Sequence, residues 1–210
     1  MFDDSCKKHA PASLRNRGPI KEILQKHLPA NGRVLEIASG SGEHCLYYAD
    51  HFPELTFQPS DKDTQALASI KAYAQECRYN NIEDPLSLDC LSIQNWPEIK
   101  AQAIICINMC HIAPWQASCG LFFKAGEILD TGPLVIYGPF FEDNVKTSQS
   151  NLAFDESLKK RDPQWGLRYV ENITGLAEQN GLTLMARYNM PANNLTLVFS
   201  RRQEQINFKN

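Results

Sequence analysis

The sequence predicts an α/β domain with a mostly parallel sheet and helices on both of its faces. An apolar segment at residues 34–38 is followed by a turn with Gly40 and Gly42 and then by the start of a helix. The next apolar segment ends in Asp61, 19 positions after Gly42. The apolar run at residues 101–107 is typical of a central parallel strand that is covered on both faces. Together these observations indicate repeated strand–helix units.

The composition predicts one soluble domain in the cytoplasm. The chain has 210 residues, of which 43% are hydrophobic and 21% charged, which suits one α/β domain and is short for two. The net charge of −3 predicts no broad attraction to nucleic acid or to an anionic membrane, so neither is expected as a partner. Seven cysteines without regular spacing, and an acidic start at residues 1–6 that is unlike a leader, predict reduced thiols. No apolar run approaches the roughly 20 residues that cross a bilayer.

The first 32 residues are expected to precede the main domain, residues 33–210, as an arm and a helix. Pro11 and Pro19 predict a loose arm or a short helix at the start. Apolar residues then recur at helical spacing over residues 20–28, and the stretch 29–32 ends this helix.

The turn around Gly40 and Gly42 predicts a site for a cofactor that contains a ribose. Glycines permit a sharp turn and a close approach of the ligand, and the helix that follows directs free N–H groups toward it. Asp61 lies where dinucleotide-binding folds place a ribose-binding carboxylate. Glu36 and Glu43 flank the turn, and carboxylates repel a pyrophosphate but attract the ammonium and sulfonium groups of S-adenosylmethionine. We therefore expect S-adenosylmethionine rather than NAD.

The remaining elements alternate in the same way to the end of the chain. A long polar insert at about residues 142–168 is of the kind that often forms a lid or binding loop. The tail from Arg201 is expected to be frayed. In order, the predicted elements are a helix at 44–52, a strand at 55–60, a helix at 64–76 capped by Asp63, a short strand at 86–90, a turn at Trp96, a strand at 101–107, a helix at 121–129, a strand at 134–137, a helix at 169–180, and strands at 183–189 and 195–199.

The residues after the strand at 101–107 are candidates for the place where cofactor and substrate meet. In doubly wound sheets, ligands bind at the carboxyl ends of the strands, where the strand order reverses. Polar and aromatic side chains gather here in the sequence. They are Asn108, Met109, His111 and Trp115.

His111 has more than one interpretation. The ordinary pKa of histidine suits it to act as a general base, but a structural, hydrogen-bonded histidine fits the sequence equally well. A zinc site with Cys106 and Cys110 is not expected, because the spacing is not C-x₂-C and no second pair completes a tetrahedron. No metal is predicted.

Six strings spread over the chain resemble one known family. In the first half they are V-L-E-I-A-S-G-S-G-E-H at 34–44, Q-P-S-D at 58–61 and N-M-C-H-I-A-P-W at 108–115. In the second half they are G-P-F at 138–140, S-N-L-A-F-D-E-S-L-K-K-R-D-P-Q-W-G at 150–166 and M-P-A-N-N-L at 190–195. Together they resemble the methyltransferase-like protein 26 family (DUF938), a family of unknown function with features of class I methyltransferases. E-I-A-S-G-S-G resembles motif I of those enzymes, with Ala38 in place of the usual first glycine.

The resemblance implies a class I methyltransferase fold of the Rossmann-like type. Its mostly parallel seven-stranded sheet would have the order 3-2-1-4-5-7-6, and residues 1–32 would cover the cofactor cleft. The implied cofactor is S-adenosylmethionine, released as S-adenosylhomocysteine, with Asp61 on its ribose and Asp89 on its adenine. The residues expected to bind it are Glu36, Ala38, Gly40, Gly42, His44, Asp61, Asp89, Cys90, Asn108 and Met109.

The implied activity is methyl transfer to a small polar acceptor, with His111 and Asn108 as candidate catalytic residues. Arg15 and Arg17 could meet a carboxylate of either the cofactor or the substrate. Two alternatives stay open: a catalytically silent protein that binds the cofactor or a partner, and an NAD-dependent oxidoreductase. Residues expected on the substrate side, which are also types that pack or cap helices, are Arg15, Asn16, Arg17, Trp115, Tyr137, Asn151, Phe154, Arg161 and Trp165. The oligomeric state is not predicted.

Overall fold

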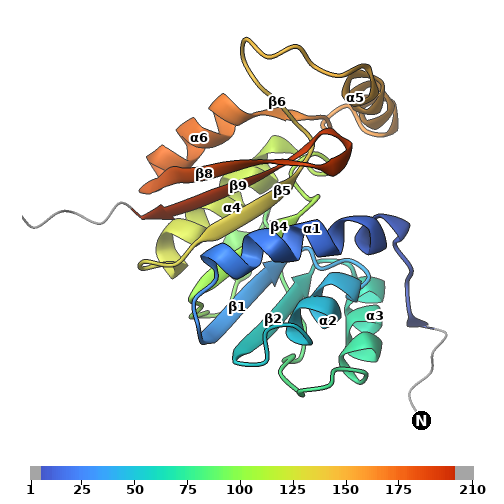
Figure 1. Cartoon of the computed structure of the whole chain (residues 1–210), viewed down its shortest axis with the longest axis vertical. Coiled ribbons are helices and arrows are strands. Elements are labelled where there is room, and N and C mark those ends of the chain that lie inside the picture. The colour runs from blue at the N-terminus through green and yellow to red at the C-terminus, as the bar shows by residue number, and fades with distance from the viewer. Residues whose placement is uncertain (1–5, 202–210) are drawn as a thin grey trace, which may run out of the picture.

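The computed structural model describes residues 6–201, and its centre is a twisted seven-stranded sheet (Figure 1). The strands are β1 (Gly32–Ile37), β2 (Leu55–Asp61), β3 (Leu86–Ser87), β4 (Ala103–Ile107), β5 (Leu134–Gly138), β8 (Leu182–Met190) and β9 (Asn194–Arg201). Their order is β3-β2-β1-β4-β5-β9-β8, parallel from β3 to β5, with β9 antiparallel to both β5 and β8. Counted among themselves, the strands have the predicted order 3-2-1-4-5-7-6, so the predicted fold class is confirmed.

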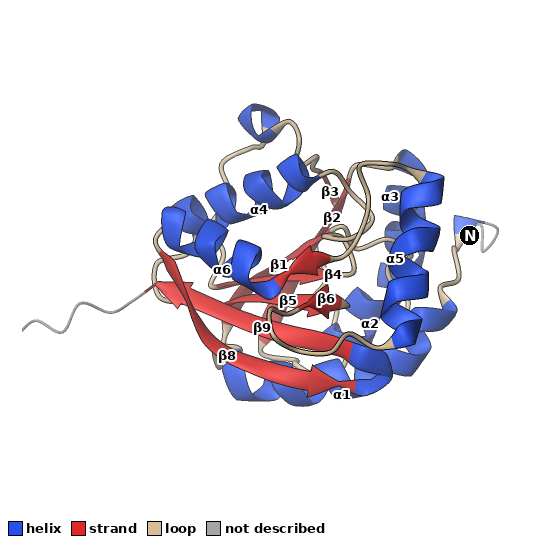
Figure 2. Ribbon diagram, turned by 90° about the horizontal axis from the view of Figure 1, so that it is seen from above, coloured by secondary structure: helices blue, strands red, loops and turns tan. Residues whose placement is uncertain are grey.

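Helices cover both faces of the sheet (Figure 2). One face is covered by α1 (Pro11–His27) and α2 (Glu43–Ala49), and the other by α4 (Trp115–Ile128) and α6 (Val170–Gln179). The remaining helices are α3 (Thr64–Ala74), which packs beside α2 and β2, α5 (Gln149–Arg161), and the short 3-10 helices η2 (Ile93–Asn95) and η3 (Pro191–Asn193).

Successive residues of the central strands enter opposite cores, because side chains alternate across a strand. Val34 and Ile105 belong to the core beneath α1 and α2. Leu35 and Ile104 belong to the core beneath α4 and α6. This double burial explains why the central strands are apolar at almost every position, which is the pattern that predicted the fold.

The N-terminal region decides between two predicted alternatives, because residues 11–19 form the first half of α1 and therefore a helix, not a loose arm. Pro11 occupies the first turn of the helix, where its missing N–H would have no partner in any case. Pro19 lies inside the helix and removes a backbone hydrogen bond. Packing offsets this loss, since Ile20 and Leu24 are fully buried against the sheet.

The predicted insert contains a helix, α5, that its sequence pattern does not reveal. The apolar residues of this helix are few, so it lacks a clear helical periodicity. The Asp155 carboxylate accepts a hydrogen bond of 2.8 Å from the Leu167 N–H, which ties the end of the insert to the helix. At its base, β6 (Phe140–Phe141) and β7 (Arg168–Tyr169) pair in parallel and close the insert.

Two further element boundaries differ from the predictions. The strand predicted at 86–90 is shorter, because the neighbouring β2 ends at Asp61 and offers no partner beyond Ser87. The helix predicted at 121–129 begins already at Trp115, since its first turns bury small residues and therefore lack large apolar side chains at helical spacing.

The two ends of the chain limit what can be compared with the predictions. Of the acidic start at 1–6 only Cys6 is described, and of the tail predicted to fray from Arg201 only Arg201; residues 1–5 and 202–210 lie outside the described residues. Arg201 itself belongs to β9 and donates from Nε to the Leu129 carbonyl at 2.8 Å. Between residues 6 and 201, no helix combines the length and apolar character that crossing a bilayer requires.

Candidate functional site

A tight turn joins β1 to α2, and three of its residues adopt left-handed backbone conformations. Ala38, Gly40 and Gly42 have φ angles of 56°, 60° and 92°. A Cβ on Gly42 would lie 2.9 Å from the Ile70 Cα, so packing against α3 also requires glycine there. A Cβ on Gly40 would meet nothing within 4 Å. The backbone at Gly40 is therefore open to a ligand.

Glu36 is buried next to this turn with a carboxylate oxygen that lacks a partner. Its side chain is 2% exposed, and no group among residues 6–201 hydrogen-bonds its Oε2 atom. Burial raises the pKa of Glu36 to about 7; hydrogen bonds with Ser39 and Cys45 oppose the shift, and the nearby Asp61 adds to it. Because an unpaired buried oxygen is costly, the site favours a ligand that donates a hydrogen bond or carries positive charge.

Asp61, at the end of β2, shapes the turn from the other side. Its Oδ2 accepts a hydrogen bond from the Gly40 N–H at 2.9 Å, and its Oδ1 accepts one from the Asp63 N–H at 3.0 Å. Each oxygen retains a lone pair for a further donor. Asp63 itself accepts a hydrogen bond from the Gln65 N–H, which confirms that it caps α3.

Glu43 does not face a ligand as the charge argument expected. Its carboxylate lies 2.7 Å from His9 Nδ1 and accepts hydrogen bonds from the Ala10 N–H at 2.8 Å and the Ser41 hydroxyl at 2.9 Å. These bonds attach the segment before α1 to the turn. Negative charge toward a ligand is therefore left to Glu36 and Asp61.

Asp89 and Cys90 follow β3 at the same edge of the sheet. The Asp89 Oδ1 atom accepts a hydrogen bond of 2.9 Å from the Leu91 N–H, and its backbone carbonyl accepts one from the Trp96 indole. Its Oδ2 atom has no partner within the described part of the chain. Cys90 is buried in the same core as Met109. The structure thus places four of the predicted cofactor residues, Asp61, Asp89, Cys90 and Met109, at or just after the carboxyl ends of β2, β3 and β4.

The chain turns sharply after β4, where Asn108 has a φ of 64°. The Asn108 N–H donates to the Tyr137 carbonyl of β5 at 2.8 Å. Gly138 lies directly against this loop, since an added Cβ would come within 3.1 Å of His111 Nδ1 and 3.8 Å of Asn108 Oδ1. Asn108 and His111 are therefore held side by side at the carboxyl end of β4, beside the switch in strand order.

His111 is buried, yet one of its ring nitrogens is unpaired. The residue is 5% exposed, and Nδ1 has no hydrogen-bond partner among the described residues. Burial lowers the pKa of His111 to about 4, with a smaller contribution from Arg168, so the ring is neutral at pH 7. Its edge contacts Phe154 of α5, with ring centroids 5.6 Å apart.

Asn16 of α1 joins His44 to Tyr137. The Asn16 Oδ1 atom lies 2.7 Å from His44 Nε2, and Asn16 also hydrogen-bonds the Tyr137 side chain. Burial lowers the pKa of His44 to about 4, so this ring is neutral and its Nε2–H donates to the amide oxygen. The bond fixes the position of α1 relative to the start of α2.

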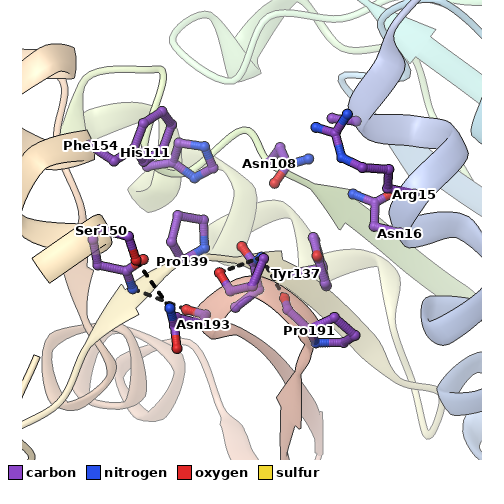
Figure 3. Close-up of a pocket in the computed structure, with 14 residues that line it drawn as sticks. Arg15, Asn16, Asn108, His111, Tyr137, Pro139, Ser150, Phe154, Pro191 and Asn193 are labelled. Carbon is purple, nitrogen blue, oxygen red and sulfur yellow. Dashed lines mark hydrogen bonds between the residues drawn. The ribbon is translucent and has the colours of Figure 1, made fainter. Parts of the chain in front are cut away.

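A cleft of about 770 Å³ opens between α1, the loop after β4, α5 and the turn between β8 and β9 (Figure 3). It is lined by these predicted residues: Arg15, Asn16, Asn108, His111, Tyr137, Asn151 and Phe154. It is also lined by residues that were not predicted: Ala12, Pro139, Ser150, Pro191, Ala192, Asn193 and Asn194. Four of the latter form the turn between two strands, where Ala192 and Asn193 are left-handed. The two adjacent asparagines were a signal for such a turn.

Four predicted substrate-side residues, Arg17, Trp115, Arg161 and Trp165, do not line the cleft. Each of them takes part in a contact between an arginine and an aromatic ring. Arg17 stacks over the Tyr47 ring at 4.5 Å, and Arg161 over the Trp165 ring at 4.9 Å. Trp115 lies 5.9 Å from the Arg168 guanidinium. These contacts favour a packing role for all four.

The cysteines near the site are free thiols. Cys106 and Cys110 hydrogen-bond each other in the core beneath the loop after β4. Within residues 6–201, no three His, Cys, Asp or Glu side chains are grouped as a metal ion would need.

The chain matches one family model over residues 7–201, which is almost all of the described structure. Its description is "Protein of unknown function (DUF938)". The chain belongs to the DUF938 family. The resemblance predicted from the six sequence strings is therefore confirmed.

Three solved structures similar to this DUF938 chain are described as methyltransferases. An O-methyltransferase family protein from Burkholderia thailandensis has 16% identity and a TM-score of 0.77, over 92% of this chain and 58% of the other. An O-methyltransferase family 2 protein from Planctomyces limnophilus, in complex with apigenin, has 16% identity and a TM-score of 0.77, over 91% and 58%. CalO1, a methyltransferase in calicheamicin biosynthesis in an SAH-bound form, has 15% identity and a TM-score of 0.70, over 86% and 52%. This chain thus spans just over half of their length, and the similarity shows the fold.

Proposed function

We propose that this DUF938 protein is an S-adenosylmethionine-dependent methyltransferase that methylates a hydroxyl group of a small acceptor. The observation that carries the proposal is the neutral, buried His111, which lies beside Asn108 and lines a cleft with it. The turn after β1, with Glu36 next to it, is at the same edge of the sheet. Similar structures described as O-methyltransferases, one of them in complex with apigenin, support the same reaction class.

The residues around the turn after β1 suit a positively charged cofactor that contains a ribose. Glu36 offers its unpaired oxygen to an ammonium group, and Asp61 retains lone pairs for ribose hydroxyls. Asp89 has a free oxygen for the amine of adenine, and Gly40 leaves its backbone open. When bound, S-adenosylmethionine supplies an electrophilic methyl group. A pyrophosphate would face Glu36 and be repelled, which disfavours NAD.

His111 is suited to take a proton from an acceptor hydroxyl. A neutral imidazole has one nitrogen lone pair, and His111, which lines the cleft, can present it to the acceptor. Asn108 provides an amide next to it that can orient the same hydroxyl. The pKa of His111 lies at about 4, so the ring keeps the transferred proton only while the acceptor oxygen carries negative charge. Once the oxygen is methylated, the ring releases this proton to solvent.

Calorimetric titration with S-adenosylhomocysteine, with NAD as the control ligand, tests the cofactor site. We expect micromolar binding of S-adenosylhomocysteine that weakens by about tenfold or more in Asp61→Asn, because a charge-assisted contact to the ribose is lost. Asp63→Asn is the matched control, since asparagine still caps α3 and binding should stay unchanged. Tight NAD binding, or no binding of S-adenosylhomocysteine to the unaltered protein, would contradict the proposed function.

A further inference from the structure

The lining of the cleft carries one permanent charge, and it is positive. Arg15 is the single charged side chain among the lining residues of the described chain, and no aspartate or glutamate accompanies it. His111 adds no charge, because its pKa lies at about 4. A neutral or cationic acceptor would leave this guanidinium without a counter-charge, whereas an acceptor with one negative charge would neutralise it.

Arg15 is free to bind such an anion. It is exposed on α1, and within residues 6–201 it makes no hydrogen bond, ion pair or ring contact. The neighbouring arginines are engaged: Arg17 stacks on Tyr47, and Arg168 donates to the Cys110 and Ala113 carbonyls. Only Arg15 among these three offers its full set of donors to the cleft, where a planar guanidinium can pair with two oxygens of a carboxylate.

The other side of the cleft has a different character. Figure 3 shows Arg15 and Asn16 on one side, His111 and Phe154 on the opposite side, and Asn108 between them. The Phe154 ring stands against His111, and the remaining walls combine proline and alanine side chains with those of serine and asparagine. This wall suits a flat apolar body, which would keep a polar group at each end.

We propose that the acceptor is a small aromatic hydroxy acid whose carboxylate pairs with Arg15 while its hydroxyl reaches His111 and Asn108. The proposal rests on the proposed function, since it names the substrate class of that same site. A carboxylate carries one negative charge, which one guanidinium neutralises. A phosphate monoester carries about −1.5 to −2 at pH 7 and would need a second cation, which the lining of the described chain does not provide.

The carboxylate of the cofactor is the competing partner for Arg15. The residues proposed to hold the cofactor, Glu36, Gly40 and Asp61, do not line this cleft, whereas Arg15 lines it together with His111 and Phe154. The position of Arg15 therefore favours a contact with the carboxylate of the acceptor over one with the carboxylate of the cofactor. A variant of Arg15 separates the two assignments, because each predicts the loss of a different ligand.

Calorimetric titration of the protein saturated with S-adenosylhomocysteine tests the assignment with two pairs of probes. The pairs are 4-hydroxybenzoate with 4-hydroxybenzamide, and 4-hydroxyphenylacetate with its amide. We expect at least one acid to bind about tenfold or more tightly than its amide, and Arg15→Gln to remove that difference. Arg17→Gln, two residues away on the same helix, should leave it unchanged, and Arg15→Lys should retain part of it.

Three results would overturn the proposal. In the first, neither acid binds more tightly than its amide. In the second, the preference survives in Arg15→Gln. In the third, Arg15→Gln weakens S-adenosylhomocysteine and leaves the acids unaffected, which would assign the arginine to the cofactor. Failure of the proposed function is a separate outcome, because it is seen as absent S-adenosylhomocysteine binding in the unaltered protein while the Arg15-dependent preference for acids, measured without cofactor, persists.

Discussion

The turn after β1 and the cleft beside α5 are built in opposite ways. The turn is made within one strand–helix unit and the end of the next strand, and the carboxyl groups next to it belong to Glu36, Glu43 and Asp61. The cleft collects residues from separate segments that are far apart in the chain, and the one charged group among its described lining residues, Arg15, is basic. The comparison teaches that a site made of residues close together in the sequence can be found from the sequence. A site made of residues from distant segments can be found only once the fold is known.

The largest expected effect is a loss of stability in acid, to which each region contributes one histidine. Burial lowers the pKa of His44 and His111 from the ordinary 6.5 to about 4, so the unfolded chain binds protons that the folded state excludes. The free energy of unfolding should be constant above pH 6.5 with respect to these groups and fall toward pH 4, by about 3 kcal/mol for each. Urea unfolding at pH 7 and pH 4 measures the fall.

Single variants then show how much of this loss of unfolding free energy comes from each histidine. His44→Gln and His111→Gln should each lose less stability between pH 7 and pH 4 than the unaltered protein does. Equal losses in all three proteins would show that neither histidine is kept neutral by burial.

The next effect concerns the acid at the turn. Burial raises the pKa of Glu36 to about 7, so its contribution to stability is fully present below pH 4.5 and is lost as the pH rises through 7. Glu36→Gln should therefore raise the free energy of unfolding at pH 8 by about 3 kcal/mol and change it little at pH 4.5. The same variant should bind S-adenosylhomocysteine more weakly. A variant that is less stable at pH 8 would show that the carboxylate serves the fold and not a ligand.

A smaller effect separates the two glycines of the turn. Gly42→Ala should lower the free energy of unfolding by about 2 kcal/mol, because a Cβ there combines a left-handed φ with a clash against the Ile70 backbone. Gly40→Ala has space for its Cβ and should cost about 1 kcal/mol of strain. Its main effect should be on S-adenosylhomocysteine binding. Thermal unfolding and calorimetry on both variants measure the difference, and equal destabilisation would contradict it.

The smallest effect belongs to the cleft wall. Asn151 of α5 donates from Nδ2 to the Asn193 carbonyl at 3.0 Å, which joins the insert to the turn between β8 and β9. Asn151→Ala should cost about 1 kcal/mol and leave S-adenosylhomocysteine binding unchanged. Lys160→Ala, on the exposed side of the same helix, is the control and should be neutral. A drop in cofactor affinity in Asn151→Ala would mean that the two regions are coupled.

The parts of the molecule that could be predicted from sequence depend on short-range signals. The glycine turn, the cap at Asp63 and the apolar strand at 101–107 are each defined by neighbouring residues, and the strand order followed from the family resemblance. Asn108 and His111 were candidates because the carboxyl ends of parallel strands meet at one edge of the sheet. Their roles in binding and catalysis stay predictions.

The parts that could not be predicted depend on contacts between distant segments. Pro19 is tolerated inside α1 because Ile20 and Leu24 are buried against the sheet, and no local signal reports that burial. The orientation of Arg161 and Trp165 toward each other, and of Arg15 toward the cleft, is equally a product of packing. Residue type alone therefore did not distinguish the arginine that lines the cleft from those that stack on aromatic rings.

The short parallel ladder of β6 and β7 has a consequence for engineering. Phe140 pairs with Arg168 and Phe141 with Tyr169 in a two-stranded sheet separate from the central one, so the segment between them begins and ends at one fixed base. Such a segment is an interchangeable module: grafting a different stretch between these two short strands would exchange one wall of the cleft while the turn after β1 stays intact. Acceptor preference in this scaffold could then be altered by transplanting one continuous piece of chain.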